Sequence, residues 1–161
     1  MRLSLLTAAF ALAASTALAA PAAVSVTVGP KLQEKAAKDY GVRDVERLAA
    51  SLQKDVEQSL ARSGRYADSR VELTLVDAKP NRPTFKQLGD TPGLSMQSFG
   101  VGGAEIAGRV IAADGAVQPV SYRWYETDIR QAYGDWVWSD AQWTFQRFAR
   151  RLGRGDALAA R

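Results

Sequence analysis

The sequence predicts an α+β fold, a two-layer sandwich in which two amphipathic helices cover one face of a largely antiparallel sheet of about four strands. Apolar residues recur at helical spacing in two segments, 45–60 and 141–152. Shorter segments that alternate apolar and polar residues, as strands do, precede and separate them. The resulting order is strand, helix, strand, strand, strand, helix. Two helices that each carry one apolar stripe can bury both stripes against a single sheet.

The first three elements follow from local patterns. Residues 24–28, VSVTV, alternate apolar and small polar side chains and are expected to form a strand that Gly29-Pro30 ends. Residues 31–39 are expected to form a short helical turn. A long helix follows, which Gly64 is expected to stop. Its apolar stripe is Val45, Leu48, Ala49, Leu52, Val56 and Leu60.

The middle of the chain predicts a strand, a long connection and a hairpin. Residues 70–77 alternate as a strand does, and the prolines and glycines of residues 79–93 then mark a long loop. Residues 98–113 and 117–129 flank Asp114-Gly115, a pair typical of a type I′ hairpin turn with two positive φ angles. Pro119 has no N–H to donate, which places its end of the strand at a sheet edge.

The last helix is expected to begin at Ser139, because Ser139 and Gln142 have the spacing of a capping box. Trp138 and Trp143 occupy the positions of a hydrophobic staple around this start. Gly153 is expected to end the helix, and the short tail from Arg154 to Arg161, polar at its start, is expected to be frayed. The apolar stripe comprises Ala141, Phe145, Phe148, Ala149 and Leu152.

The first 19 residues have the three parts of a cleavable secretory signal peptide. Arg2 supplies the positive charge, residues 3–14 form the apolar region, and the small residues Ala17 and Ala19 precede the cut. Cleavage after Ala19 fits better than cleavage after Ala20, because Pro21 would then directly follow the cut.

The same segment is too short for a membrane anchor, which needs about 20 apolar residues. The chain has no cysteine, so a lipid-anchored N-terminus is not expected either. The sequence therefore predicts a signal peptide over 1–19, one α+β domain over 20–155 and a C-terminal tail over 156–161. The expected location is the periplasm or the outside of the cell, with no transmembrane segment in the mature chain.

Composition excludes several kinds of chemistry. The 161 residues include no cysteine and no histidine, so disulfides, the usual zinc, copper and iron ligand sets, and Ser-His-Asp or Cys-His catalysis are not expected. No cofactor is predicted. The formal net charge is +4, of which Arg2 contributes one. This mild charge gives no reason to expect nucleic-acid binding.

The glycine-rich residues 98–105, SFGVGGAE, invite comparison with a phosphate-binding loop. Such a loop should open a helix, but residues 106–111 instead have the pattern of a strand. A strand whose glycines permit a bulge or a close backbone approach is the favoured interpretation.

A carboxylate-based enzyme is the main alternative to a binding protein, with residues 79–97 and the aromatic region forming a cleft. Glycoside hydrolysis needs two carboxyl groups about 5–10 Å apart in such a cleft. Nothing in the spacing of the acidic residues indicates such a pair, and no catalytic residue is predicted. The candidates are Glu105, Asp114, Glu126, Asp128, Asp135 and Asp140.

A basic ridge on the last helix is the candidate binding site. Trp143, Arg147, Arg150 and Arg154 fall at steps of 4, 7 and 11 and share one helix face. Guanidinium groups bind phosphate or carboxylate in a bidentate manner, which suits anionic lipid, lipopolysaccharide or an acidic envelope protein. Taken alone, the ridge is better explained as a solvated face whose arginines complement the helix dipole.

Aromatic residues concentrate between 122 and 138. They could line a groove for sugars or peptides, but a core at the junction of sheet and helix is favoured because such rings bury large apolar areas. The residues are Tyr122, Trp124, Tyr125, Tyr133, Trp136 and Trp138.

The chain loosely resembles small exported proteobacterial proteins of unknown function. The resemblance lies in the signal, residues 24–28, the Tyr40-Gly41 lead into a long helix, the strand over 71–77 and the aromatic C-terminal helix. It implies export in a Gram-negative bacterium and carries no catalytic residue. The leading hypothesis is a non-catalytic binding or accessory domain for an envelope partner or an anionic envelope component. A self-assembling structural protein, joined through the edge near Pro119, is the third alternative.

Overall fold

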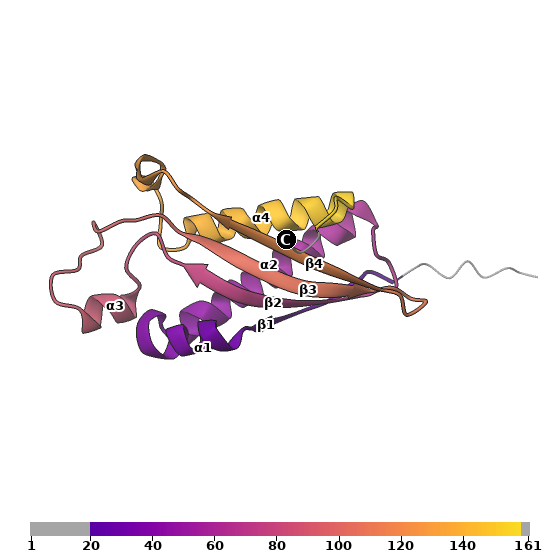
Figure 1. Ribbon diagram of the computed structural model, residues 1–161, viewed down its shortest axis with the longest axis horizontal. Coiled ribbons are helices and arrows are strands. Elements are labelled where there is room, and N and C mark those ends of the chain that lie inside the picture. The colour runs from indigo at the N-terminus through magenta and orange to yellow at the C-terminus, as the bar shows by residue number, and fades with distance from the viewer. Residues whose placement is uncertain (1–19, 159–161) are drawn as a thin grey trace, which may run out of the picture.

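The computed structural model describes residues 20–158, which form a four-stranded sheet backed by helices on one face (Figure 1). The strands are β1 (Ala23–Val28), β2 (Arg70–Lys79), β3 (Gly103–Ile111) and β4 (Val117–Tyr125), and they lie in this order across the sheet. β1 runs parallel to β2, whereas the other two pairs are antiparallel. The predicted α+β sandwich is confirmed. The predicted signal peptide, 1–19, lies outside the described residues.

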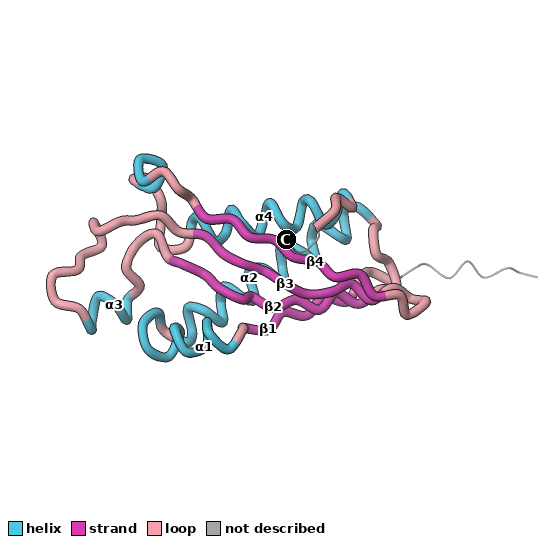
Figure 2. The backbone as a smooth tube through the Cα atoms, in the orientation of Figure 1, coloured by secondary structure: helices cyan, strands magenta, loops and turns pink. Residues whose placement is uncertain are grey.

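Two long helices form the second layer. Both α2 and α4 lie behind the sheet in Figure 1, and the loops gather at the two ends of the molecule (Figure 2). None of the helices within residues 20–158 is long and apolar enough to cross a bilayer. The helical elements are α1 (Pro30–Lys35), the π-helical turn η1 (Ala36–Tyr40), α2 (Val42–Ser63), α3 (Phe85–Asp90), the 3-10 turn η2 (Ile129–Ala132) and α4 (Ser139–Arg154).

The core lies between the sheet and the two long helices, as the periodicity predicts. Every residue of the apolar stripe predicted for α2 is buried, and so is every residue of the α4 stripe. In the sheet, Val71 pairs with Val24 on one side and Val110 on the other. Val71 and Val110 belong to the core cluster, and Val24 packs against it. Gly64 caps α2 in the left-handed conformation, with φ of 64°, so this predicted helix end is confirmed.

The hairpin forms at the predicted position, but its turn type and its lengths differ. Gly115 has a positive φ of 85°, whereas Asp114 does not, so the turn is not type I′. The Asp114 carboxylate instead accepts a hydrogen bond from Ala116 N–H at 2.9 Å. The strands are also shorter than expected, because residues 98–102 belong to the preceding loop and residues 126–129 follow the end of β4. Pro119 lies on an edge strand, as predicted.

The predicted capping box at Ser139 is wrong. Trp138 is the N-cap of α4, and its side chain accepts no capping hydrogen bond. The Ser139 hydroxyl accepts from Trp136 N–H at 2.8 Å. Asn81, from a distant loop, accepts from Asp140 N–H at 3.0 Å and so satisfies a first-turn donor.

The predicted end of α4 at Gly153 is also wrong. The helix continues to Arg154, and Gly155 caps it with φ of 76°. Gly153 instead lets α4 approach α2 closely, because a Cβ at this position would lie 2.6 Å from Ser59 Oγ. The Ser59 hydroxyl donates to Ala149 O at 2.8 Å across the same contact. A glycine here serves helix packing.

We expect Gly153→Leu to lower the free energy of unfolding by about 2 kcal/mol, because the larger side chain must push the two helices apart. Better helix propensity offsets part of this loss, by up to about 1 kcal/mol. Urea unfolding followed by circular dichroism measures the change. Gly89→Ala is the control, since a Cβ there meets nothing within 4 Å. An unfolding midpoint equal to that of the wild type for Gly153→Leu would contradict close packing of α2 and α4.

The described part of the C-terminal tail is ordered against the domain. Leu158 is only 3% exposed and belongs to the core cluster. Its carbonyl accepts a hydrogen bond from Ser121 N–H of β4 at 2.8 Å. The expectation of a frayed tail is therefore wrong for residues 156–158, because burial of the apolar Leu158 side chain stabilises the ordered tail.

Candidate functional site

The arginine ridge, defined by Trp143, Arg147, Arg150 and Arg154, lies on the outer face of α4. Trp143 is half exposed, and Arg150 and Arg154 are exposed. Arg147 differs from them, because its guanidinium lies 4.2 Å from the centre of the Trp124 ring on β4. The four residues therefore share one surface, as predicted, and one of them also contacts the sheet.

A second stacked pair extends this contact along β4. Arg151, one turn after Arg147 on α4, places its guanidinium 5.6 Å from the centre of the Tyr122 ring. Tyr122 and Trp124 are two residues apart on β4 and so lie on the same face of the strand. Their separation, about 6.6 Å, is close to the pitch of one helical turn, about 5.4 Å. Arg151 is missing from the sequence-based ridge. Two arginines four residues apart on the helix, Arg147 and Arg151, match two aromatic residues two apart on the strand. This match was the signal that could have identified Arg151.

The charges of the ridge are largely uncompensated. Within the part of the chain that the structure describes, no carboxylate lies within 4.0 Å of Arg147, Arg150 or Arg154. Arg151 has one acidic neighbour, Asp156, at 3.6 Å. An exposed row of guanidinium groups whose N–H donors are available can bind an anion from solution.

A separate pocket of about 290 Å³ lies at the loop end of the molecule. Exposed aromatic side chains flank it, with Phe85 78% and Trp136 66% exposed. It brings together the start of α2, the loop before α3 and the residues before α4. The lining residues are Asp44, Arg47, Leu48, Ser51, Pro83, Thr84, Phe85, Met96, Trp136, Val137, Trp138 and Gln142.

The aromatic residues between 122 and 138 divide between core and surface. Tyr122 and Trp138 pack against the core, as predicted. Tyr133 and Trp136 are mostly exposed, so the prediction of a core is wrong for these two. They lie in the connection between β4 and α4, after η2, and Trp136 lines the loop-end pocket.

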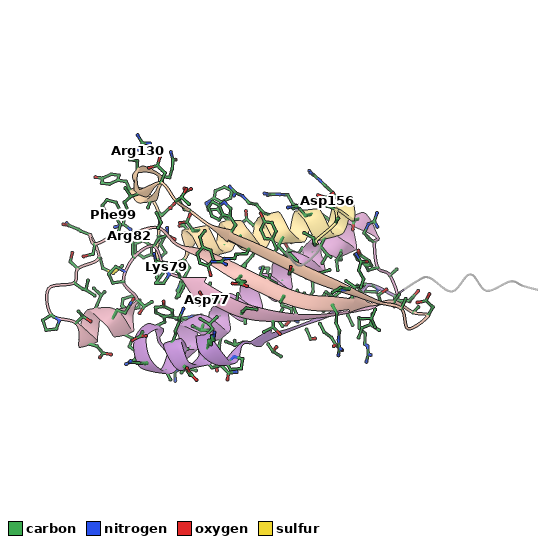
Figure 3. All side chains as sticks on the ribbon, viewed as in Figure 1. Asp77, Lys79, Arg82, Phe99, Arg130 and Asp156 are labelled. Carbon is green, nitrogen blue, oxygen red and sulfur yellow. The ribbon has the colours of Figure 1, made fainter. Side chains whose placement is uncertain are left out.

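Arg82 holds the loops of this end together. Its guanidinium donates to the backbone carbonyls of Met96 at 2.9 Å and Tyr133 at 2.7 Å, and also to that of Asp135. The same group lies 5.9 Å from the centre of the Phe99 ring, and Figure 3 shows the two side chains together at the loop end. These contacts fix the shape of the loops that surround the pocket.

The candidate carboxylates do not form a catalytic pair in the pocket. Asp44 is the only acidic lining residue, and it forms an ion pair with Arg47. Asp140 is buried and accepts hydrogen bonds from Asn81 Nδ2 and Gly102 N–H. Burial and the nearby Asp140 carboxylate raise the pKa of Asp135 above its ordinary value. In the described residues, no group of three or more acidic side chains is placed to hold a metal ion.

A polar cluster lies on the face of the sheet opposite to α2 and α4. Asp77 accepts from Lys35 Nζ at 2.6 Å and from the Tyr125 hydroxyl at 3.0 Å. The hydrogen bond from Lys35 to Asp77 raises the pKa of Lys35. Burial, followed by the Asp77 charge, raises the pKa of Tyr125. Both groups therefore stay protonated at neutral pH, and the cluster joins α1 to the sheet.

Within the glycine-rich residues 98–105, Gly103 serves close packing in the sheet. Gly103, at the start of β3, has φ of 150°, and a Cβ there would lie 2.4 Å from Trp124 O. No helix follows these residues, since β3 continues to Ile111. The favoured interpretation, a strand with a close backbone approach, is confirmed for Gly103, whereas residues 98–102 lie in the loop before β3.

The chain was compared with protein families and with curated proteins. A scan against protein-family models and a search of curated protein sequences each found no match for the chain. The fold itself defines the class of the molecule, a mixed four-stranded sheet backed by two helices. Its function is therefore argued from its surfaces.

Proposed function

We propose that the protein is an exported, non-catalytic binding domain that recognises phosphate groups of an anionic envelope component through the arginine ridge. The observation that carries this proposal is the stacking of Arg147 on Trp124 beside two further exposed arginines. The location follows from the signal peptide predicted over 1–19, and the periplasm or the cell exterior is the compartment proposed.

Stacking supports anion binding in a specific way. A guanidinium that lies over an aromatic ring keeps its N–H donors at the edge of its plane, where they remain available to phosphate. The ring also restricts the long side chain before any ligand arrives, which lowers the entropy lost on binding. Trp143, at the other end of the ridge, offers an apolar ring that can enter the boundary between headgroups and acyl chains.

The proposal is tested with vesicles that contain phosphatidylglycerol. We expect the triple variant Arg147→Gln, Arg150→Gln, Arg154→Gln to bind them about a hundredfold more weakly than the wild type, since each basic residue near such a surface contributes about 1 kcal/mol. Co-sedimentation across a range of lipid concentrations gives the affinities. Neutral phosphatidylcholine vesicles should bind neither protein.

A matched control separates the ridge from net charge. Arg43, Arg70 and Arg130 are exposed arginines on other parts of the molecule, and their triple change to Gln removes the same charge. We expect this control to lose much less affinity. Equal losses in the two triple variants, or no binding by the wild type, would rule out the ridge as a phosphate-binding site.

A further inference from the structure

The outer edge of β4 presents backbone groups that β3 does not use. β4 is the last strand of the sheet. Alternate residues of an antiparallel strand direct their N–H and C=O groups to opposite sides. Glu126 N–H donates inward to Gly102 O, and Ser121 N–H donates outward to Leu158 O. The odd-numbered residues of β4, including Pro119 and Arg123, therefore direct their backbone groups outward, away from β3.

The chain's own tail already adds to this edge over a short distance. Leu158 accepts the hydrogen bond from Ser121 and buries its side chain in the core. Two residues earlier, Asp156 lies 3.6 Å from Arg151. The described end of the chain lies beside β4 in Figure 1. The end of the chain thus already pairs its backbone with this edge at one position, Ser121.

Past Ser121 the edge borders a hollow of about 820 Å³ that the described tail does not fill. Arg123 and Arg151 line the hollow. Glu105 lies 3.9 Å from Arg123, and Asp156 of the tail lies 3.6 Å from Arg151. The Arg123 side chain is 71% exposed. The other lining residues are Ile106, Ser121, Tyr122, Trp124, Tyr125, Ala157 and Leu158.

We propose that the β4 edge binds an extended acidic segment of a partner protein by strand addition, continuing along β4 from the position of Leu158. Main-chain hydrogen bonds to the outward carbonyl of Ser121 and to the backbone of Arg123 give such a segment its register, while Ser121 N–H stays bonded to Leu158 O. Its side chains alternate between the two faces of the sheet, so acidic residues on one face meet Arg123, and apolar residues on the other face lie near Tyr122, Trp124 and Leu158. This surface and this class of partner go beyond the phosphate site on the ridge.

Three synthetic peptides test the mode of binding to the chain that begins at Ala20. The probe is an eight-residue peptide of alternating aspartate and valine. A second peptide replaces aspartate with lysine, and a third keeps the acidic sequence but carries N-methyl groups on alternate backbone nitrogens. Strand addition predicts at least tenfold weaker binding of both controls, since one has the wrong charge and the other lacks main-chain donors.

Two variants at one position separate the side chain from the backbone. Arg123→Ala removes the charge and keeps the outward N–H, whereas Arg123→Pro removes both. A proline without an outward N–H already stands on this edge at position 119. We expect Arg123→Pro to bind the acidic peptide about tenfold more weakly than Arg123→Ala. Both should bind phosphatidylglycerol vesicles as the wild type does, which separates this inference from the proposed function.

The amide resonances of β4 in NMR spectra report the site directly. The acidic peptide should shift the signals of Ser121 and Arg123 in the wild type and in the Arg147→Gln, Arg150→Gln, Arg154→Gln variant. If Arg123→Pro does not fold, the comparison of the acidic peptide with its N-methylated form on the wild type still decides the matter. Equal affinity for these two peptides, or shifts confined to other parts of the chain, would overturn strand addition at β4.

Discussion

Asn81→Ala should lower the free energy of unfolding by about 3 kcal/mol, although Asn81 lies in a loop and contributes no apolar surface. The side chain is 2% exposed, and it bonds both the backbone and the carboxylate of Asp140. Its Nδ2 group lies 2.6 Å from Asp140 Oδ2. Removal of the amide leaves a buried carboxylate and a first-turn N–H of α4 without these partners, and such unpaired groups are costly.

Urea unfolding at neutral pH, with circular dichroism and tryptophan fluorescence as two probes, measures this loss. Gln131→Ala is the control, because Gln131 is exposed and its side chain forms no hydrogen bond with the described residues. We expect that control to stay within about 0.5 kcal/mol of the wild type. An Asn81→Ala protein with the stability of the wild type would mean that water replaces the amide at no cost.

The elements that sequence reasoning located are those whose pattern is local. The stripe of α2 is legible because each of its buried residues follows the previous one by about one helical turn, and Gly64 then supplies the left-handed cap. The hairpin between β3 and β4 was located by Asp114-Gly115 for the same reason. Its turn type was not, because the aspartate side chain bonds Ala116 N–H and so favours a different turn.

The errors fall where a partner distant in sequence decides the structure. Ser139 and Gln142 have the spacing of a cap, but Asn81, 59 residues before Asp140, satisfies the helix start instead. Gly153 near the end of a helical pattern is typical of a stop. Only the approach of Ser59 on α2 explains why this residue must lack a side chain.

The candidate site was predictable in part for the same reason. The ridge residues share a face because helical spacing alone determines it. That Trp124 and Tyr122 lie beneath Arg147 and Arg151 depends on which strand forms the edge beside α4. The loop-end pocket depends on several segments that the network of Arg82, Asn81 and Asp140 brings together. The local periodicity of the sequence does not indicate these long-range contacts.

Phe145→Ala is expected to cost about 4 kcal/mol, a larger loss than the one expected for Asn81→Ala. Phe145 is fully buried, and it belongs to the cluster that joins α4 to the sheet. Truncation removes a large apolar area from the core and leaves a cavity that neighbouring strands, fixed by their hydrogen bonds, cannot close. In thermal unfolding the change should lower the midpoint by roughly 15 °C.

Phe85→Ala makes the same chemical change at the rim of the loop-end pocket, where the ring is 78% exposed. Its midpoint should stay close to that of the wild type, since the ring buries little area. The pair therefore tests whether the burial of the two phenylalanines is assigned correctly. If Phe85→Ala lost as much stability as Phe145→Ala, the exposed aromatic rim would have to be part of the core, and the pocket beside it could not be open to a ligand.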